Sequence, residues 1–283
     1  MLDLSSPVWQ QLQGPFGSAK AVPGLLKQLQ ADYAADVKDE LYWEQLYHQD
    51  TIYSSTYAAL PYLSELASQA DDPKVKLDIY ATCGTFVANQ TVVNSGQFPG
   101  EFDRHDPPLA EELIQAIYTA YLGAVDTLGK LSEEIILYAG AAEEDDSEKR
   151  YVLAADAAYR GDQAVAGMLL TYSEGDEYIA GCPTCHEDMY IWPNENGLGM
   201  TAYPDDPVFS SKEGGRVVEP SVSGTARSGD DALARLWQAA VTIKDSQLLG
   251  QLPYLSGRVA CPSCREPLEI WPELVRMYEE QQD

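Results

Sequence analysis

The chain contains two copies of one cysteine motif. The sequence CPTCHEDMYIWP runs from Cys182 to Pro193, and CPSCREPLEIWP runs from Cys261 to Pro272. A Cys-x-x-Cys turn brings two thiolates together, and two such turns supply the four sulfur ligands of a tetrahedral zinc ion. We therefore predict one structural zinc site, whose ligands are Cys182, Cys185, Cys261 and Cys264.

The residues around each cysteine pair favour β-strands. Aromatic and β-branched side chains occupy residues 177–181 and 189–192 around the first pair, and residues 258–260 and 268–271 repeat the arrangement around the second. Each pair would then lie in the turn of a β-hairpin, which is half of a zinc ribbon. Because four thiolates leave no coordination position for water, we expect the metal to stabilise the fold and not to activate a nucleophile.

Three alternatives to zinc remain open for these cysteines. Iron in a rubredoxin-like site has the same four-thiolate shell, and the spacing alone does not separate the two metals. Cys-Pro-x-Cys also occurs in thioredoxin-like oxidoreductases, where a helix N-terminus lowers the pKa of one thiol. Here we expect no helix after either pair, since Pro193 and Pro272 should each close a short strand. Two structural disulfides are the third alternative.

The composition is that of a soluble globular chain with an unusual charge. Its 283 residues are 45% hydrophobic, and its N-terminus lacks the basic and apolar regions of a signal peptide. No apolar run is long enough to span a membrane. Four of the five cysteines are in the two motifs, which suits a reducing compartment, and Cys83 is expected in the core. We predict a cytoplasmic protein.

The net charge restricts the choice of partners. The chain has 18 Lys and Arg residues against 45 Asp and Glu residues, a formal net charge of −27. Contacts to phosphate need clustered Lys and Arg, so binding to nucleic acid or to an anionic membrane is not expected. Such a field attracts a basic protein partner, although solubility alone could also account for the acidity.

Helix signals dominate the sequence from Val22 to Tyr172. Asp72-Pro73 and Asp106-Pro107 each read as an N-cap followed by proline at the first helical position. Further helix starts are expected at Ser132, at Asp145 with Glu148 as a capping box, and at Asp162. Helices joined by short polar turns predict stacked α-hairpins, an α-solenoid of the HEAT or armadillo kind, with a compact bundle as the alternative.

The domain organisation follows from these patterns. We predict a helical repeat-like domain over residues 1–176 and a zinc-ribbon-like module over residues 177–283, so the fold class is mainly α with a small β module. The module is formed by residues 177–193 and 257–272. Residues 194–256 are inserted between them, as an irregular Gly-, Pro- and Ser-rich loop at 194–229 followed by an amphipathic helix over Asp230–Leu249.

We assign no catalytic residue and do not predict an enzyme. Glu44 and His48 are four residues apart in a helical stretch, and Asp50 follows, but no nucleophile or metal-ligand spacing accompanies them. The sequence contains no dinucleotide-binding, phosphate-loop, nucleophile-elbow or zinc-protease motif. An active site assembled from dispersed residues is the enzymatic alternative.

One stretch of the N-terminal part carries a family resemblance. The sequence YWEQLYHQDTIYSSTYAALPYL covers Tyr42–Leu63. It resembles a group of bacterial HEAT-repeat-like proteins through Trp43, Leu46, His48, Gln49, Thr51, Tyr53, Thr56, Ala58, Ala59, Pro61 and Leu63.

Members of that group are often associated with bacterial toxin and immunity loci, so the resemblance implies an interaction protein, in particular an immunity protein that binds and neutralises a toxin. A nucleic-acid-cleaving toxin would present a basic substrate groove, which would complement the acidity of this chain. A zinc-stabilised scaffold or adaptor is the alternative.

Overall fold

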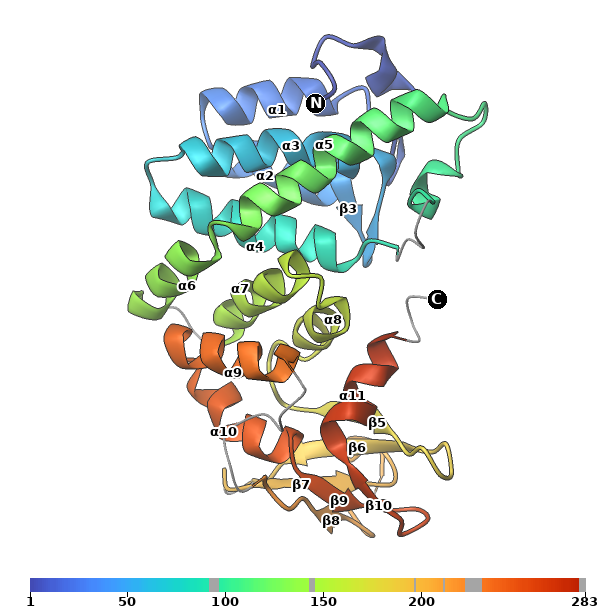
Figure 1. Ribbon diagram of the computed structural model, residues 1–283, viewed down its shortest axis with the longest axis vertical. Coiled ribbons are helices and arrows are strands. Elements are labelled where there is room, and N and C mark those ends of the chain that lie inside the picture. Colours follow the sequence, from blue (N-terminus) through green and yellow to red (C-terminus); the bar gives the residue numbers. More distant parts are fainter. Residues whose placement is uncertain (92–96, 143–145, 196, 211, 222–230, 280–283) are drawn as a thin grey trace. The chain divides into compact units, whose positions relative to one another are not determined.

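Helices form most of the protein, as the sequence predicts. The computed structural model describes residues 1–91, 97–142, 146–195, 197–210, 212–221 and 231–279 (Figure 1). The described chain forms two compact units. The first contains residues 1–135 and 158–161, and the second contains residues 136–157 and 162–283. This division differs from the predicted boundary between residues 176 and 177, because the helical residues 136–157 and 163–171 belong to the unit that holds the cysteines.

The first unit is built around one buried helix, α3 (Ser54–Gln69), on which α1 (Val22–Ala31), α4 (Pro73–Ala88) and α5 (Glu111–Gly129) pack. Short elements complete it: a 3₁₀ turn Pro7–Gln10, β1 (Gln13–Gly14), β2 (Gly17–Ser18), α2 (Ala35–Asp39), a π-helix Glu40–Leu46, β3 (Tyr47–His48), β4 (Thr51–Ile52) and a 3₁₀ turn Gly100–Phe102. Most of α3, from Ser54 to Ser64, is buried, including the side chain of Tyr57. The core of this unit therefore lies along α3.

The two proline-based helix starts have different outcomes. Asp72 caps α4 as expected, because its carboxylate accepts the backbone N–H of Lys74 at 2.9 Å and Pro73 is the first helical residue. The start predicted at Asp106-Pro107 is wrong: this peptide bond is cis, and α5 begins at Glu111. A second proline, Pro108, follows directly, and the residue before a proline is held in extended conformations that cannot start a helix.

The other predicted helix starts agree with the structure only in part. Ser132 is the first residue of α6 (Ser132–Ala141), and its hydroxyl hydrogen-bonds that of Tyr80 at 2.7 Å. Asp162 occupies the N-cap position of α8 (Gln163–Thr171), yet its carboxylate binds the guanidinium of Arg235 and no backbone N–H of the helix. The capping box predicted from Asp145 lies outside the described residues, immediately before α7 (Asp146–Tyr159).

The second unit combines helices with two antiparallel sheets. Strands β5 (Tyr178–Gly181), β6 (Asp188–Pro193), β7 (Met200–Tyr203) and β8 (Arg216–Val217) form a four-stranded sheet in that order, and β9 (Arg258–Ala260) pairs with β10 (Pro267–Glu269). Its other helices are α9 (Asp231–Ile243), α10 (Ser246–Leu255) and α11 (Ile270–Glu279). Helix α11 packs on β5 and on α8.

The insertion between the motifs is more ordered than the sequence suggested. The irregular loop predicted at 194–229 is wrong where β7 and β8 extend the sheet, while residues 222–229 lie outside the described chain. In β7, buried Met200 and Ala202 alternate with half-buried Thr201 and Tyr203. This two-residue period is the strand signal, and the surrounding Gly and Pro residues obscured it.

The single helix predicted over Asp230–Leu249 is also wrong, because two helices occupy this stretch; Asp230 itself is not described. Lys244 adopts a positive φ of 60°, which ends α9. Asp245 then caps α10 by accepting the backbone N–H of Leu248 at 2.7 Å. A capping aspartate inside an apolar periodic run can therefore split that run into two helices.

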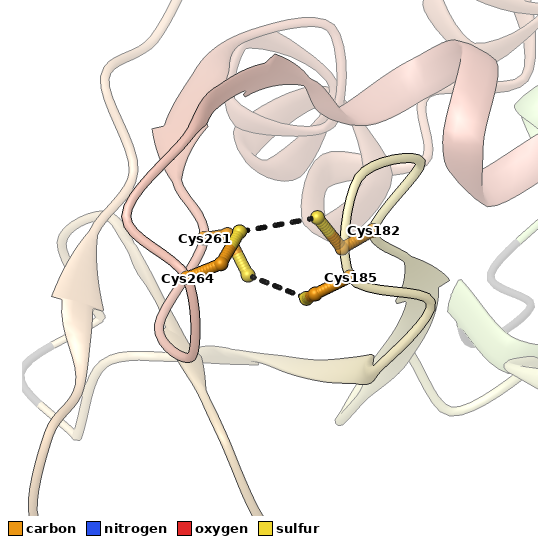
Figure 2. A group of neighbouring side chains, drawn as sticks. All are labelled: Cys182, Cys185, Cys261 and Cys264. Carbon is orange, nitrogen blue, oxygen red and sulfur yellow. Dashed lines mark hydrogen bonds between the residues drawn. The ribbon is translucent and has the colours of Figure 1, made fainter.

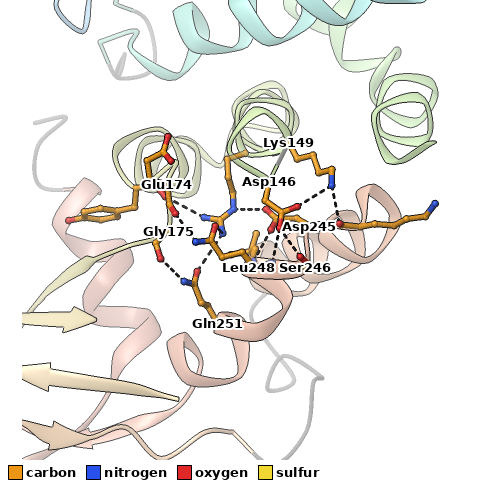
Figure 3. Close-up of polar contacts among 12 residues, drawn as sticks. Asp146, Lys149, Glu174, Gly175, Asp245, Ser246, Leu248 and Gln251 are labelled. Carbon is orange, nitrogen blue, oxygen red and sulfur yellow. Dashed lines mark hydrogen bonds and ion pairs between the residues drawn. The ribbon is translucent and has the colours of Figure 1, made fainter. Parts of the chain in front are cut away.

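A buried charge network joins three elements of the second unit (Figure 3). The guanidinium of Arg150 on α7 donates to the carboxylate of Asp245, and both side chains are fully buried. Arg150 also donates to the hydroxyl of Tyr178 at 3.3 Å, and that hydroxyl donates to Gln251 of α10 at 2.8 Å. Tyr178 is the first residue of β5, the strand that leads directly into Cys182. The network therefore holds the first cysteine hairpin against α7 and α10.

Candidate metal centre

The four predicted cysteines converge at one point of the second unit (Figure 2). Their sulfur atoms all lie within 4.8 Å of one another. Two of the separations are 3.7 Å, between Cys182 and Cys264, and 3.8 Å, between Cys185 and Cys261. Sulfurs bound at about 2.3 Å to one tetrahedral zinc ion lie about 3.8 Å apart, so these thiols already have the spacing of ligands to a single metal.

The two turns have the same backbone geometry. The N–H of Cys182 donates to the carbonyl of Glu187 at 2.9 Å, and the N–H of Cys261 donates to that of Glu266 at 2.8 Å. In each turn the residue after the second cysteine has a positive φ, 60° at His186 and 75° at Arg265. The repeated motif therefore produces two copies of one local structure, and each copy presents two thiols.

The strands that carry the first turn match the prediction. Strands β5 and β6 pair antiparallel, with Gly181 opposite Asp188 next to the turn. Strands β9 and β10 carry the second turn in the same way, with Ala260 opposite Pro267. The first hairpin continues into β7 and β8, whereas the second remains a pair. The expected arrangement of two hairpins that face each other through their cysteines is confirmed.

The end of the second motif differs from the prediction. Residues 268–271 were expected to be a strand, but β10 ends at Glu269 and α11 begins at Ile270. Pro272 lies in the first turn of this helix, where its missing N–H costs no helical hydrogen bond. Buried Ile270, Leu274 and Tyr278 recur at helical spacing. Residues 268–271, for which a strand was predicted, are too few to show this spacing.

Helix α11 also bears on the redox alternative, for which we expected no helix after either cysteine pair. A helix does follow the second pair, yet its first residue comes six positions after Cys264, so neither thiol lies at its N-terminus. All four cysteines are free thiols, and the sulfur separations given above are nearly twice the length of a disulfide bond. The four thiols could therefore hold a metal ion together, and no pair of them forms a disulfide.

Backbone N–H groups lower the pKa of the thiols at this site, and at Cys182 they favour the thiolate. Burial raises the pKa of the Cys182 thiol, but N–H groups of Cys185 and Thr184 outweigh this effect and hold that pKa at about 7. For Cys264 the N–H of Glu266 lowers the pKa, but burial and the three neighbouring cysteines outweigh it and raise the pKa to about 12. Four thiols this close cannot all ionise by themselves, and a divalent cation would remove that repulsion.

Access to the four sulfurs is uneven. Cys182 and Cys261, the first cysteine of each turn, are buried, whereas Cys185 and Cys264 are partly exposed. His186 directly follows Cys185 and is exposed, and it does not belong to the group of possible metal ligands. The donor set is therefore four sulfurs, with soft ligands that suit zinc or iron.

The stretch considered for acid–base chemistry does not form such a site. The π-helix ends at Leu46, so Glu44 and His48 do not share a helix face; His48 lies in β3 and its ring contacts Phe16. Asp50 instead accepts a hydrogen bond from the hydroxyl of Tyr47 at 2.6 Å. Cys83, expected in the core, is fully buried.

Sequence reasoning missed a buried serine–histidine pair in the first unit. The Nε2 of His105 lies 3.0 Å from the hydroxyl of Ser54, which also accepts the backbone N–H of Gln13 at 2.9 Å. Burial lowers the pKa of His105, and a backbone contact at Gln11 opposes this. Both side chains are buried, and the hydrogen bond from Gln13 to Ser54 ties β1 to the start of α3. No local pattern connects residues this far apart in sequence.

Comparison with known proteins identifies no related protein. No protein-family model matches the chain, and neither the curated proteins nor the solved structures contain a significant match. Among the described helices, none combines the length and apolarity needed to cross a bilayer. What can be said of function therefore rests on the four-sulfur site and on the charge of the chain.

Proposed function

We propose that the protein is an acidic, cytoplasmic binding protein whose second unit is stabilised by one structural zinc ion. The convergence of four cysteine sulfurs supports this proposal most directly. Four protein ligands complete a tetrahedral shell, so no position remains for a substrate or for a reactive water. The metal then contributes to folding, and binding of a partner is left to the protein surface.

The charge of the chain supports a basic partner. A formal net charge of −27 over 283 residues produces a field that accelerates encounter with a positively charged protein and opposes encounter with nucleic acid. Among basic proteins, we propose a bacterial toxin that acts on nucleic acid, whose basic groove the chain would cover as an immunity protein. The resemblance of Tyr42–Leu63 to HEAT-repeat-like proteins supports this choice and a repeat-like stacking of the helices of the first unit.

The experiment is affinity purification of the tagged, full-length protein from its native host at moderate salt, followed by mass spectrometry of proteins that co-elute in stoichiometric amount. A single basic protein whose toxicity is suppressed on co-expression is the expected result. Stoichiometric recovery of housekeeping machinery would replace the immunity role with that of an adaptor. Recovery of no partner from the native host would contradict the proposed function.

A further inference from the structure

One face of the four-stranded sheet carries mostly aromatic and aliphatic side chains that remain at least partly exposed. The strand register aligns Ile179, Tyr190 and Tyr203 as one row, and Trp192, Thr201 and Val217 as a second row. We name these six residues the aromatic face. Their neighbours along the strands point to the opposite side, where Tyr178, Ile191 and Ala202 are buried.

The members of this face remain accessible. Val217 is 74% exposed, and the other five are partly exposed. The β7–β8 connection approaches the face at Gly215, where an added Cβ would lie 2.8 Å from the ring of Tyr203. Part of the surface of each of these side chains is therefore open to solvent.

The loop after β7 adds apolar side chains that are held in solvent. Val208 and Phe209 are 63% and 88% exposed. Asp206 orders their turn, because its carboxylate accepts the N–H of Val208 at 2.8 Å and its carbonyl accepts the N–H of Phe209 at 3.1 Å. This turn therefore holds two apolar side chains in solvent directly after β7.

Several carboxylates act on residues of the aromatic face. Burial raises the pKa of Tyr190, and the charges of Asp188, Asp206, Asp205 and Glu177 raise it further. Burial and the charges of Asp176 and Asp206 also raise the pKa of Glu177, although the indole of Trp192 opposes this. Carboxylates therefore act on the Tyr190 ring from both ends of the sheet segment, whereas Lys212 lies near Tyr203.

We propose that the aromatic face and its surrounding carboxylates bind an arginine-rich segment of the partner protein. Guanidinium groups stack on tyrosine and tryptophan rings through cation–π attraction and pair with carboxylates in the same contact, which an ammonium group does less well. The inference rests on the proposed function in one respect, that the chain binds a basic protein. It adds the surface, the element of the fold that forms it and the side-chain chemistry that the surface selects.

The first test measures binding of a nona-arginine peptide to the full-length, metal-loaded protein by calorimetry at low salt, with binding located by NMR. We expect the largest shifts at the aromatic face. Exchange of three exposed carboxylates there, in the variant Asp176→Asn/Asp188→Asn/Asp205→Asn, should weaken binding about tenfold.

The matched control removes three exposed carboxylates of the first unit, as Asp32→Asn/Glu44→Gln/Asp71→Asn, and therefore changes the net charge equally. It should weaken binding by less than about twofold. Equal weakening in the two triple variants would show attraction to net charge alone and would overturn the inference.

The second test separates the rings from the charges. The variant Tyr190→Leu/Tyr203→Leu retains apolar bulk but removes two π-faces, so its affinity for nona-arginine should fall about fivefold, while its smaller affinity for nona-lysine changes less. Unchanged affinity for nona-arginine in this variant would overturn the stacking. If it fails to fold, the carboxylate variants still decide the location.

These measurements do not depend on finding the natural partner. A protein that binds nona-arginine at the aromatic face but recovers no basic partner from its host would retain the surface and lose the proposed function. A recovered partner that binds the Asp176→Asn/Asp188→Asn/Asp205→Asn variant as tightly as the wild type would retain the function and lose the surface.

Discussion

Arg150 is the largest fully buried charged side chain among the described residues, and its environment determines whether it stabilises the fold. Burial lowers its pKa, but Tyr178 and Asp245 outweigh this effect and raise it. The guanidinium therefore stays charged inside the second unit. Removal of one member of such a pair leaves the other charge buried without compensation, which typically costs more than the pair itself contributes.

Replacement of Arg150 by methionine should therefore destabilise the second unit strongly. We expect the variant Arg150→Met to lose about 3–5 kcal/mol of unfolding free energy, measured by urea denaturation with circular dichroism. The same substitution at Arg235, whose pair with Asp162 is partly exposed, should cost less than about 1 kcal/mol. Similar losses in the two variants would contradict the account of the buried network.

Asp146 predicts a pH-dependent contribution to stability. Burial raises its pKa, but hydrogen bonds from Ser246, Lys149 and the backbone of Gln247 outweigh burial and lower it. A carboxyl group whose pKa is lower in the folded state adds stability above its unfolded pKa of about 4, and this stability is lost as the pH falls through the folded pKa.

The wild type should therefore melt at a higher temperature than the variant Asp146→Asn at neutral pH, and the difference should shrink as the pH falls below 4. Thermal melts of both proteins across this pH range measure the effect. Because acid also protonates the cysteines and releases the metal from both proteins, only the difference is interpreted. A difference that grows towards low pH would contradict the assignment.

For single residues, the sequence predicts the role of those that belong to a repeated local motif. It does not predict the role of residues that depend on distant partners. The four cysteines were identified because each Cys-Pro-x-Cys turn encodes its own geometry. Arg150 and Asp245 were not identified, since 95 positions separate them and neither has a local pattern. The polar role of Asp162 was also missed, because its partner Arg235 comes from another helix.

At the scale of elements, helices α6 and α9 approach unusually closely. A Cβ added at Gly140 of α6 would lie 2.5 Å from the carbonyl oxygen of Thr242 and 3.0 Å from the backbone of Ile243. Backbone atoms cannot move aside as a flexible side chain can. The absence of a side chain at Gly140 is therefore what permits this contact between the helices.

The variant Gly140→Ala should lose about 1–3 kcal/mol of stability, even though alanine is the better helix former. The control is Gly250→Ala in α10, where the added Cβ meets no atom within 4 Å apart from the neighbouring backbone of its own helix, and where we expect a gain of about 0.5–1 kcal/mol. Chemical denaturation measures both. A gain at both positions would contradict the close approach.

Elements with one dominant signal were predictable, and elements with competing signals were not. The strands β5 and β6 were expected because aromatic and β-branched residues fill them. Helix α11 was missed because IWP occurs in both motifs, yet it ends a strand at Pro193 and begins a helix before Pro272. The residues that follow decide the outcome: Asn194 starts a turn with Gly199, whereas Leu274 and Tyr278 continue a buried helical stripe.

At the scale of the whole molecule, charge and division into units determine the expected behaviour. Net negative charge was read directly from the sequence, but the division of the chain at residues 135–136 was not, because helices on both sides carry similar patterns. The assignment of a helix to a unit depends on long-range packing, which a single sequence does not display. The stacked arrangement of an α-solenoid stays a prediction.

The proposed binding of a basic partner predicts how the association rate depends on salt. Because the field of the chain steers a basic protein, the association rate constant should fall on the order of tenfold between low and high salt, while the dissociation rate constant changes less. Stopped-flow mixing with the co-purified partner measures both constants. An association rate constant that is independent of salt would contradict electrostatic steering.

The central claim, that the two cysteine turns share one structural metal ion, is tested most directly by metal analysis of protein purified under reducing conditions. We expect one zinc ion per chain in the wild type and none in the variants Cys182→Ser and Cys261→Ser, each of which should also melt at a lower temperature while it keeps much of its helix. Iron in place of zinc would change the metal but retain the shared site. Unchanged metal content and melting temperature in both variants would contradict it.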